Sequence, residues 1–484
     1  MKVLYVTPEY VPWVKTGGLG DVSGALPPAL AALGHDVVVL IPAYDAFAPL
    51  IERQPVAVLA AADGWPAARV TLAEQPGGVR LLLLECPELY SHSGGPYIDG
   101  QGNDHPHNAF RFAFLSHIAA LLSGGDSPWA DWRPDILHCH DWTCGLAPFY
   151  LHLARQGGVA GTAASVMTIH NLAFQGIFPM DAADSLHIPP AWRGVGGMEY
   201  WGRLSMLKAG LQFSDAITTV SPTYAREICT ESLGMGLHGV LQSRADRLYG
   251  ILNGVDTDIW NPAKDRLLPH RYRVGALWGK AVCKGALQRE CGLAERPGAL
   301  LLSLVGRLTE QKGIDLVVEA LPWIVSQNVQ LVVLGQGDAR LQDALRAAAA
   351  LHPRQVSINI GFSETQAHRI EAGADAFLMP SRYEPCGLNQ MYSQLYGTPP
   401  LVHATGGLAD SVVDVSAGAD HATGFVIPEA TPAALVRGLE RLLRAFRDPP
   451  LWHALQRNGM RSGFGWQDSA RAYDALFRDL RRSA

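Results

Sequence analysis

Several features are scarce or missing in this chain of 484 residues, and each absence removes a class of protein. Its seven cysteines include no Cys-x-x-Cys pair, which is typical of reduced thiols rather than of a disulfide framework. No stretch of about 18 uninterrupted apolar residues occurs, so no membrane span is predicted. An apolar strand begins directly after Met1-Lys2, so we expect no signal peptide and a cytoplasmic location.

Positive charge is not in excess either. Lysine and arginine number 39 against 45 aspartates and glutamates, so neither nucleic acid nor an anionic membrane is expected as a partner. The sequence holds no G-x-S-x-G elbow, no H-E-x-x-H and no Walker loop. Residues 234–239 fit G-x-G-x-x-G, but they follow a helical stretch at 223–232 instead of the strand that a dinucleotide site requires.

What the sequence does contain is an alternation of strands and helices that occurs twice. Near the N-terminus and again near residue 300, an apolar strand is followed by a glycine-rich loop, a helix and a second strand. The predicted elements are a strand at 3–6, a helix from Asp21 to Leu33 and a strand at 36–41, then a strand at 300–305, a helix at 314–325 and a strand at 329–334. This order predicts an α/β protein with two parallel sheets, whose facing loops line a cleft.

The boundary between the two halves is predicted near Tyr249-Gly250, just before a strand and turn at 251–256. The predicted domains are therefore 1–250 and 251–464. Residues 465–484 are predicted to form a terminal helix that packs back on the N-terminal domain.

Three glycine-rich loops follow strands, at Lys15–Val22, Gly306–Gly313 and Thr405–Asp410. Free backbone N–H groups at such places favour an anion, usually a phosphate. Lys15 adds a cation to the first loop, and Arg307 and Lys312 add two to the second, which suits a diphosphate. Any one loop alone is compatible with an ordinary turn and solvated charges, but three together favour phosphate binding.

Polar side chains also follow strands. Asp141, His170 and Glu384 each stand where a parallel strand ends, and Glu384 lies beside Pro385 in a position to accept hydrogen bonds from sugar hydroxyls. The run His138-Cys139-His140 has the residue types of a metal site. Its spacing fits no structural zinc pattern, and alternate strand residues point to opposite faces, so no metal is predicted.

Together these motifs resemble the bacterial and plant type of glycogen or starch synthase, a retaining glucosyltransferase with two Rossmann-like domains facing across a deep cleft (the GT-B architecture). The resemblance covers essentially the whole chain. It lies in the segments Lys15–Val22, His140–Trp142, Thr168–Gly176, Ile251–Asp256, Gly306–Gly313, Glu384–Leu388 and Thr405–Asp410.

The resemblance implies transfer of glucose from ADP-glucose to the non-reducing end of an α-1,4-glucan such as glycogen, with no metal and no cofactor. By the same resemblance, each site residue has an implied place in the reaction. The donor's phosphates are held by Lys15, Arg307 and Lys312, assisted by Gly18, Thr405, Gly406 and Gly407. The glucosyl unit is surrounded by Asp141, His170, Asn253, Glu384 and Cys386, with Gly387 and Leu388 beside them. The nucleotide end is contacted by Tyr97.

Three positions depart from the family pattern. Tyr392 stands where related glucosyltransferases carry a second glutamate, which leaves the ribose contact open, and His107 and His403 replace a usual aspartate and arginine. The phosphate loops do not read the base, so UDP-glucose or another acceptor, as in sucrose or maltose-1-phosphate formation, stays an alternative. A further alternative is a non-catalytic glucan-binding protein. This hypothesis predicts that the site residues are lost, but all of them are present. A glucan phosphorylase requires a lysine that carries pyridoxal phosphate.

Overall fold

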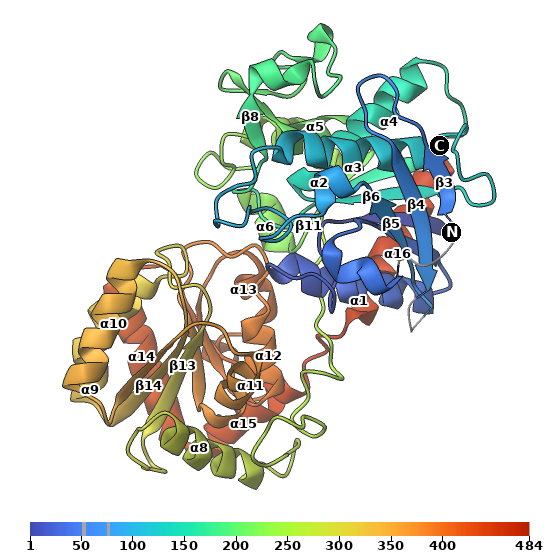
Figure 1. Cartoon of the computed structure of the whole chain (residues 1–484). Coiled ribbons are helices and arrows are strands. Elements are labelled where there is room, and N and C mark those ends of the chain that lie inside the picture. Colours follow the sequence, from blue (N-terminus) through green and yellow to red (C-terminus); the bar gives the residue numbers. More distant parts are fainter. Residues whose placement is uncertain (51–54, 75–77, 484) are drawn as a thin grey trace. The chain divides into compact units, whose positions relative to one another are not determined.

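The computed structural model describes residues 1–50, 55–74 and 78–483. The chain divides into two compact units (Figure 1). Unit 1 comprises Met1–Gly254 and Trp466–Ala484, and unit 2 comprises Val255–Gly465. The C-terminal segment thus belongs to the same unit as the N-terminus.

Unit 1 is built on a large mixed sheet. Among the residues that the structure describes, nine strands follow the order β12-β11-β7-β6-β1-β2-β5-β4-β3. They are β1 (Lys2–Val6), β2 (Asp36–Pro42), β3 (Pro55–Leu59), β4 (Ala68–Glu74), β5 (Arg80–Glu85), β6 (Ile136–His140), β7 (Ala164–Ile169), β11 (Ala216–Thr219) and β12 (Leu248–Gly250). Neighbouring strands from β12 to β5 run parallel, whereas β4 and β3 are added antiparallel at one edge.

A small antiparallel sheet, in the order β8-β10-β9, is a separate part of unit 1. Its strands are β8 (Ile177–Pro179), β9 (Glu199–Tyr200) and β10 (Arg203–Ser205). The helices of unit 1 are α1 (Gly18–Ala32), α2 (Pro87–Tyr90), α3 (Asn108–Leu122), α4 (Leu146–Gln156), α5 (Met206–Phe213), α6 (Pro222–Glu227), α7 (His238–Ser243) and α16 (Trp466–Ser483).

Helix α16 is fixed to unit 1 by polar and aromatic contacts. His35 Nε2 and Asp474 Oδ1 are 2.9 Å apart, and the Phe477 ring meets the rings of both His35 and His138. Ser469 Oγ donates a hydrogen bond to the carbonyl oxygen of Leu252 at 2.5 Å. The last helix therefore packs against the beginning and the end of the first long segment of the chain.

Unit 2 contains a parallel sheet in the order β15-β14-β13-β16-β17-β18. Its strands are β13 (Leu300–Val305), β14 (Val329–Gly335), β15 (Val356–Ile360), β16 (Ala376–Met379), β17 (Pro400–His403) and β18 (Phe425–Ile427). Its helices are α8 (Trp278–Glu290), α9 (Ile314–Ser326), α10 (Ala339–Leu351), α11 (Glu364–Gly373), α12 (Asn389–Leu395), α13 (Gly406–Ser411), α14 (Pro432–Phe446) and α15 (Pro449–Met460).

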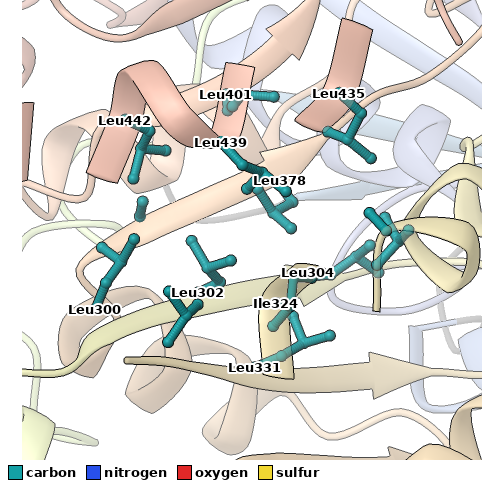
Figure 2. Close-up of a cluster of buried hydrophobic side chains, with 14 of the residues drawn as sticks. Leu300, Leu302, Leu304, Ile324, Leu331, Leu378, Leu401, Leu435, Leu439 and Leu442 are labelled. Carbon is teal, nitrogen blue, oxygen red and sulfur yellow. The ribbon is translucent and has the colours of Figure 1, made fainter. Parts of the chain in front are cut away.

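The core of unit 2 lies between one face of this sheet and helices α9 and α14 (Figure 2). Leu300, Leu302 and Leu304 alternate along β13 toward this core, and Leu435 and Leu439 reach it from α14. All five are buried, and burying a leucine stabilises a fold by about 1.5–3 kcal/mol. The core thereby fixes the positions at which the strands end.

The structure confirms the predicted α/β class with parallel sheets in two units and differs in local detail. No strand forms at 251–256, because the ladder ends at Gly250 of β12, where the N–H of Ile251 donates to Thr219 as the chain leaves the sheet. Helix α1 begins at Gly18 rather than at Asp21. The antiparallel strands β3 and β4 are an addition that the strand–helix alternation did not predict.

Candidate active site

In each unit the strand order reverses beside the first strand of the sheet. In unit 2 the chain runs from β13 outward to β14 and β15, then returns to β16 on the other side of β13. In unit 1 the same reversal separates β1 from β6. Ligands of parallel sheets bind at such switch points, beyond the carboxyl ends of the strands. The predicted site residues follow these strands.

An ion pair joins the loops after β13 and β16. Lys312 Nζ lies 2.5 Å from Glu384 Oε2, and the Ser381 hydroxyl donates to the same oxygen at 3.1 Å. The Glu384 side chain is 8% exposed and that of Lys312 is 21% exposed. A carboxylate and an ammonium group are thus held at the switch point with one edge open to solvent.

Hydrogen bonds of backbone and side chains join these two loops. The N–H of Arg382 donates to the Gln311 carbonyl at 2.8 Å, and Gln311 Nε2 donates to the Tyr383 carbonyl at 3.2 Å. Arg307 is exposed and donates to Gln311 Oε1 at 3.2 Å. Both predicted phosphate-binding cations of this unit therefore lie on one interlocked pair of loops.

The loop after β17 packs closely against the β16 loop. The N–H of Gly407 donates to the carbonyls of Glu384 and Pro385, each at 3.2 Å. A Cβ on Gly406 would lie less than 3.0 Å from the Glu384 carbonyl oxygen, and one on Gly407 would meet the Cys386 backbone in the same way. These two glycines are therefore required by packing, whatever else they bind.

The remaining predicted residues of unit 2 lie in the same region. Cys386 is buried, Gly387 has a φ of +69° that favours glycine, and Leu388 precedes α12. Thr405 is buried immediately before α13, which begins at Gly406. The structure thus brings every predicted site residue from Arg307 to Gly407 to the loops after β13, β16 and β17.

Unit 1 contains a half-buried carboxylate next to its switch point. Asp141 follows β6 with a φ of +55°, a strained value for a residue other than glycine, and its Oδ1 accepts a hydrogen bond from the N–H of His170 at 2.7 Å. Burial raises the pKa of Asp141 to about 7, although backbone N–H groups of His170 and Asn171 oppose the rise. The carboxyl group therefore titrates near neutral pH.

The imidazole of His170 is neutral. Burial lowers its pKa to about 3, and its Nε2 lies 2.9 Å from Nδ1 of His140. The expectation that the 138–140 side chains cannot converge is wrong for the two histidines, because residues two apart share a strand face and their rings lie 4.2 Å apart. His138 is engaged by the Thr168 hydroxyl at 2.7 Å. Within the described residues, no group of three or more metal-ligating side chains is placed to hold a metal ion.

The first glycine-rich loop is organised by a residue that sequence reasoning missed. The Glu9 carboxylate, which is buried, accepts hydrogen bonds from the N–H groups of Thr16 (2.6 Å) and Gly17 (3.0 Å) and from the Tyr97 hydroxyl (2.6 Å). Glu9 follows the end of β1, so the rule that found Asp141 applies to it as well.

The other predicted residues of unit 1 lie at different depths. Lys15 pairs with Asp21 at 2.7 Å, and its side chain is 43% exposed. Gly18 begins α1 and has open space where a Cβ would stand. Asn253 is buried at the end of the unit, one residue after the carbonyl that Ser469 binds.

Comparisons with known proteins agree over both halves. Residues 2–243 match the starch synthase catalytic domain, and residues 293–460 match the glycosyl transferases group 1 domain. The chain is 54% identical to the glycogen synthase of Aromatoleum aromaticum over 100% of this chain and 98% of that protein. The chain belongs to the glycogen and starch synthase family. A second member, the glycogen synthase of Paracidovorax citrulli, is also 54% identical, over 100% of this chain and 96% of its own length.

A solved member of this family has the same architecture. The catalytic domain of starch synthase IV from Arabidopsis thaliana, bound to ADP and acarbose, superposes with a TM-score of 0.87 at 29% identity, covering 99% of both chains. A sucrose-phosphate synthase from Thermosynechococcus elongatus, at 18% identity and a TM-score of 0.60, shares the fold. As a member of the family, the chain is a hexosyltransferase of glycogen synthesis with the GT-B fold. No helix in the described part of the chain is long and apolar enough to cross a membrane.

The pKa of Asp141 leads to a testable pH dependence. A folded-state pKa raised from 3.8 to about 7 stabilises the fold fully below pH 3.8, and this contribution is lost as the pH rises through 7. Asp141→Asn keeps an acceptor for the His170 N–H but cannot ionise. We therefore expect the melting temperature of the wild type, relative to the variant, to fall between about pH 4 and pH 7 and to level off above pH 7. A difference independent of pH would contradict the raised pKa.

Proposed function

We propose that this enzyme transfers glucose from ADP-glucose to the non-reducing end of an α-1,4-glucan, with retention of configuration and without a metal or cofactor. The observation that carries the proposal is the Lys312–Glu384 pair, held at the switch point of unit 2 by interlocked loops. The family membership supports a glucan product, and the neighbour with ADP and acarbose supports an adenine nucleotide as the donor's leaving group.

In this proposal the unit 2 residues act on the leaving diphosphate. Lys312 and Arg307 neutralise the charge that grows on its oxygen as the bond to the glucosyl carbon breaks. Glu384 accepts hydrogen bonds from hydroxyls of the glucosyl unit, and the 405–407 loop contributes backbone N–H groups. When the donor binds, Lys312 gives up part of its contact with Glu384 and pairs with the phosphate instead. The charge of Lys312 is then balanced by the phosphate, and Glu384 accepts hydrogen bonds from the sugar.

The unit 1 residues act on the sugars. The acceptor hydroxyl oxygen forms the new bond to the glucosyl carbon, and its proton passes to the departing phosphate. A neutral His170 and the Asp141 carboxyl offer hydrogen bonds to sugar hydroxyls. Lys15 and Gly18 contribute to phosphate binding, Tyr97 to the nucleotide end and Asn253 to the glucosyl unit. A reaction of this kind does not require the paired carboxylates of glycoside hydrolysis.

The test is incorporation of labelled glucose into glycogen from ADP-glucose and, separately, from UDP-glucose, each with and without EDTA. We expect ADP-glucose to be the better donor and EDTA to have no effect. Preference for UDP-glucose would overturn the choice of donor. Loss of activity with EDTA that Mg²⁺ restores would overturn the metal-free reaction, and no incorporation from either donor would overturn the proposed activity.

A further inference from the structure

A tryptophan stands where the backbone of unit 1 disfavours it. Strands β9 and β10 are joined by a two-residue turn, Trp201-Gly202, with φ angles of +49° and +76°. Such turns favour Asn-Gly because both residues have positive φ, and a bulky residue in this conformation is an outlier. Trp201 is 82% exposed, so burial does not offset the strain. Neither turn geometry nor core packing explains the residue.

The turn is nevertheless held firmly. Gly202 donates its N–H to Glu199 Oε1 at 2.7 Å, and the Tyr200 hydroxyl donates to the Met235 carbonyl at 2.8 Å. A Cβ on Gly236 would lie 2.8 Å from the Tyr200 hydroxyl and 3.3 Å from the Trp201 indole nitrogen, so both side chains lie beside that glycine. The 234–237 loop therefore packs against the hairpin beside the exposed Trp201 ring.

The hairpin is connected to the loop that begins at His170. Gln175, in that loop, donates from Nε2 to the same Met235 carbonyl at 2.9 Å. The neighbouring residue, Phe174, is 53% exposed. On the other side, the ring of Trp142, next to Asp141, lies 5.8 Å from the ring of Phe178 in β8. Two exposed aromatic rings thus stand on segments that are tied to the Asp141 and His170 loops.

We propose that Trp201 and Phe174 form a stacking platform for the acceptor glucan, away from its reacting end; this inference rests on the proposed function. The flat, apolar C–H face of a pyranose ring matches an exposed aromatic face, and the indole N–H supplies a hydrogen-bond donor for a hydroxyl. The turn is flanked by one acidic and one basic residue, Glu199 and Arg203, so its net charge is close to zero. This suits an uncharged ligand such as a glucan. The strain at Trp201 is retained because the ring binds a ligand.

The test compares Trp201→Asn with the wild type. Asparagine before glycine is favoured in this turn, so the variant should melt at the same or a higher temperature. We expect its KM for glycogen to rise about 10-fold, while its KM for the nucleotide-glucose donor stays within 2-fold. The loss should be smaller with maltotriose, which spans fewer subsites, and Trp201→Tyr should restore part of the affinity. Leu351→Asn, at an exposed position of unit 2, is the matched control.

Two readouts separate this inference from the proposed function. In gels containing glycogen, the wild type should be retarded more than Trp201→Asn even if no donor supports transfer. Equal retardation, or an unchanged KM for glycogen in the folded variant, would overturn the platform. Failure of the wild type to transfer glucose, together with retardation that depends on Trp201, would overturn the proposed activity and leave the platform supported.

Discussion

Replacing Lys312 by alanine is expected to lower kcat about 100- to 1,000-fold and to leave the fold intact. Removing one preorganised donor to developing negative charge typically costs about 3–4 kcal/mol in the transition state. Lys312 fits that role because its ammonium group is held 2.5 Å from Glu384 at the switch point. The measurement is the initial rate of glucose transfer to glycogen at saturating donor, with circular dichroism to check the fold.

The matched control for Lys312 is another cation of the same unit, Arg340, which pairs with a carboxylate of the β13 loop. Arg340 pairs with Glu310 at 2.6 Å, but both side chains are more than half exposed. Exposed pairs contribute about 0–1 kcal/mol, so Arg340→Ala should leave turnover within about 2-fold. Turnover like that of the wild type in Lys312→Ala would refute the phosphate role. An equal loss in both variants would show that general surface charge is responsible.

Gly406→Ala is expected to damage both stability and activity. The added Cβ would lie less than 3.0 Å from the Glu384 carbonyl oxygen, and a φ of +43° is unfavourable for alanine. Backbone strain and overpacking together cost about 3 kcal/mol, which lowers the melting temperature of a unit of this size by about 6–12 °C. Because the clash is with the backbone of Glu384, a shift of about 1 Å there is expected to cost about 100-fold in turnover.

Two other glycines serve as controls that separate backbone strain from overpacking as causes of the lower melting temperature. Gly298 has open space and no positive φ, so Gly298→Ala should leave the melting temperature nearly unchanged. Gly418 has open space but a φ of +88°, so Gly418→Ala reports the backbone strain alone. If Gly406→Ala melts no lower than Gly418→Ala, the close packing of the 405–407 loop on Glu384 is not important for stability.

Much of the fold could be predicted because its signals are local. The alternating leucines of β13 and the helical spacing after Gly313 appear in short windows of sequence, as does the polar residue that follows each strand. Those windows were sufficient to place Asp141, Glu384, Arg307 and Lys312 in loops that follow strands. They failed at 251–256, where Ile251-Leu252 resembles the start of a strand but the chain leaves the sheet after Gly250.

Other features depend on contacts that no window contains. Glu9 organises the first loop only because a turn brings its carboxylate back to the N–H groups of Thr16 and Gly17. The strain at Trp201 becomes visible only when the hairpin places it in a turn with positive φ.

The sequence by itself determined the α/β class, the family and the residue types at the strand ends, because periodicity and glycine positions follow from local backbone geometry. Only the tertiary structure decided that Lys312 meets Glu384, 72 residues away, and that Asp141 lies in surroundings that raise its pKa to about 7. The physical reason is that strand order sets which loops become neighbours, and burial sets the dielectric around each charge. Both arise from the packing of the whole unit.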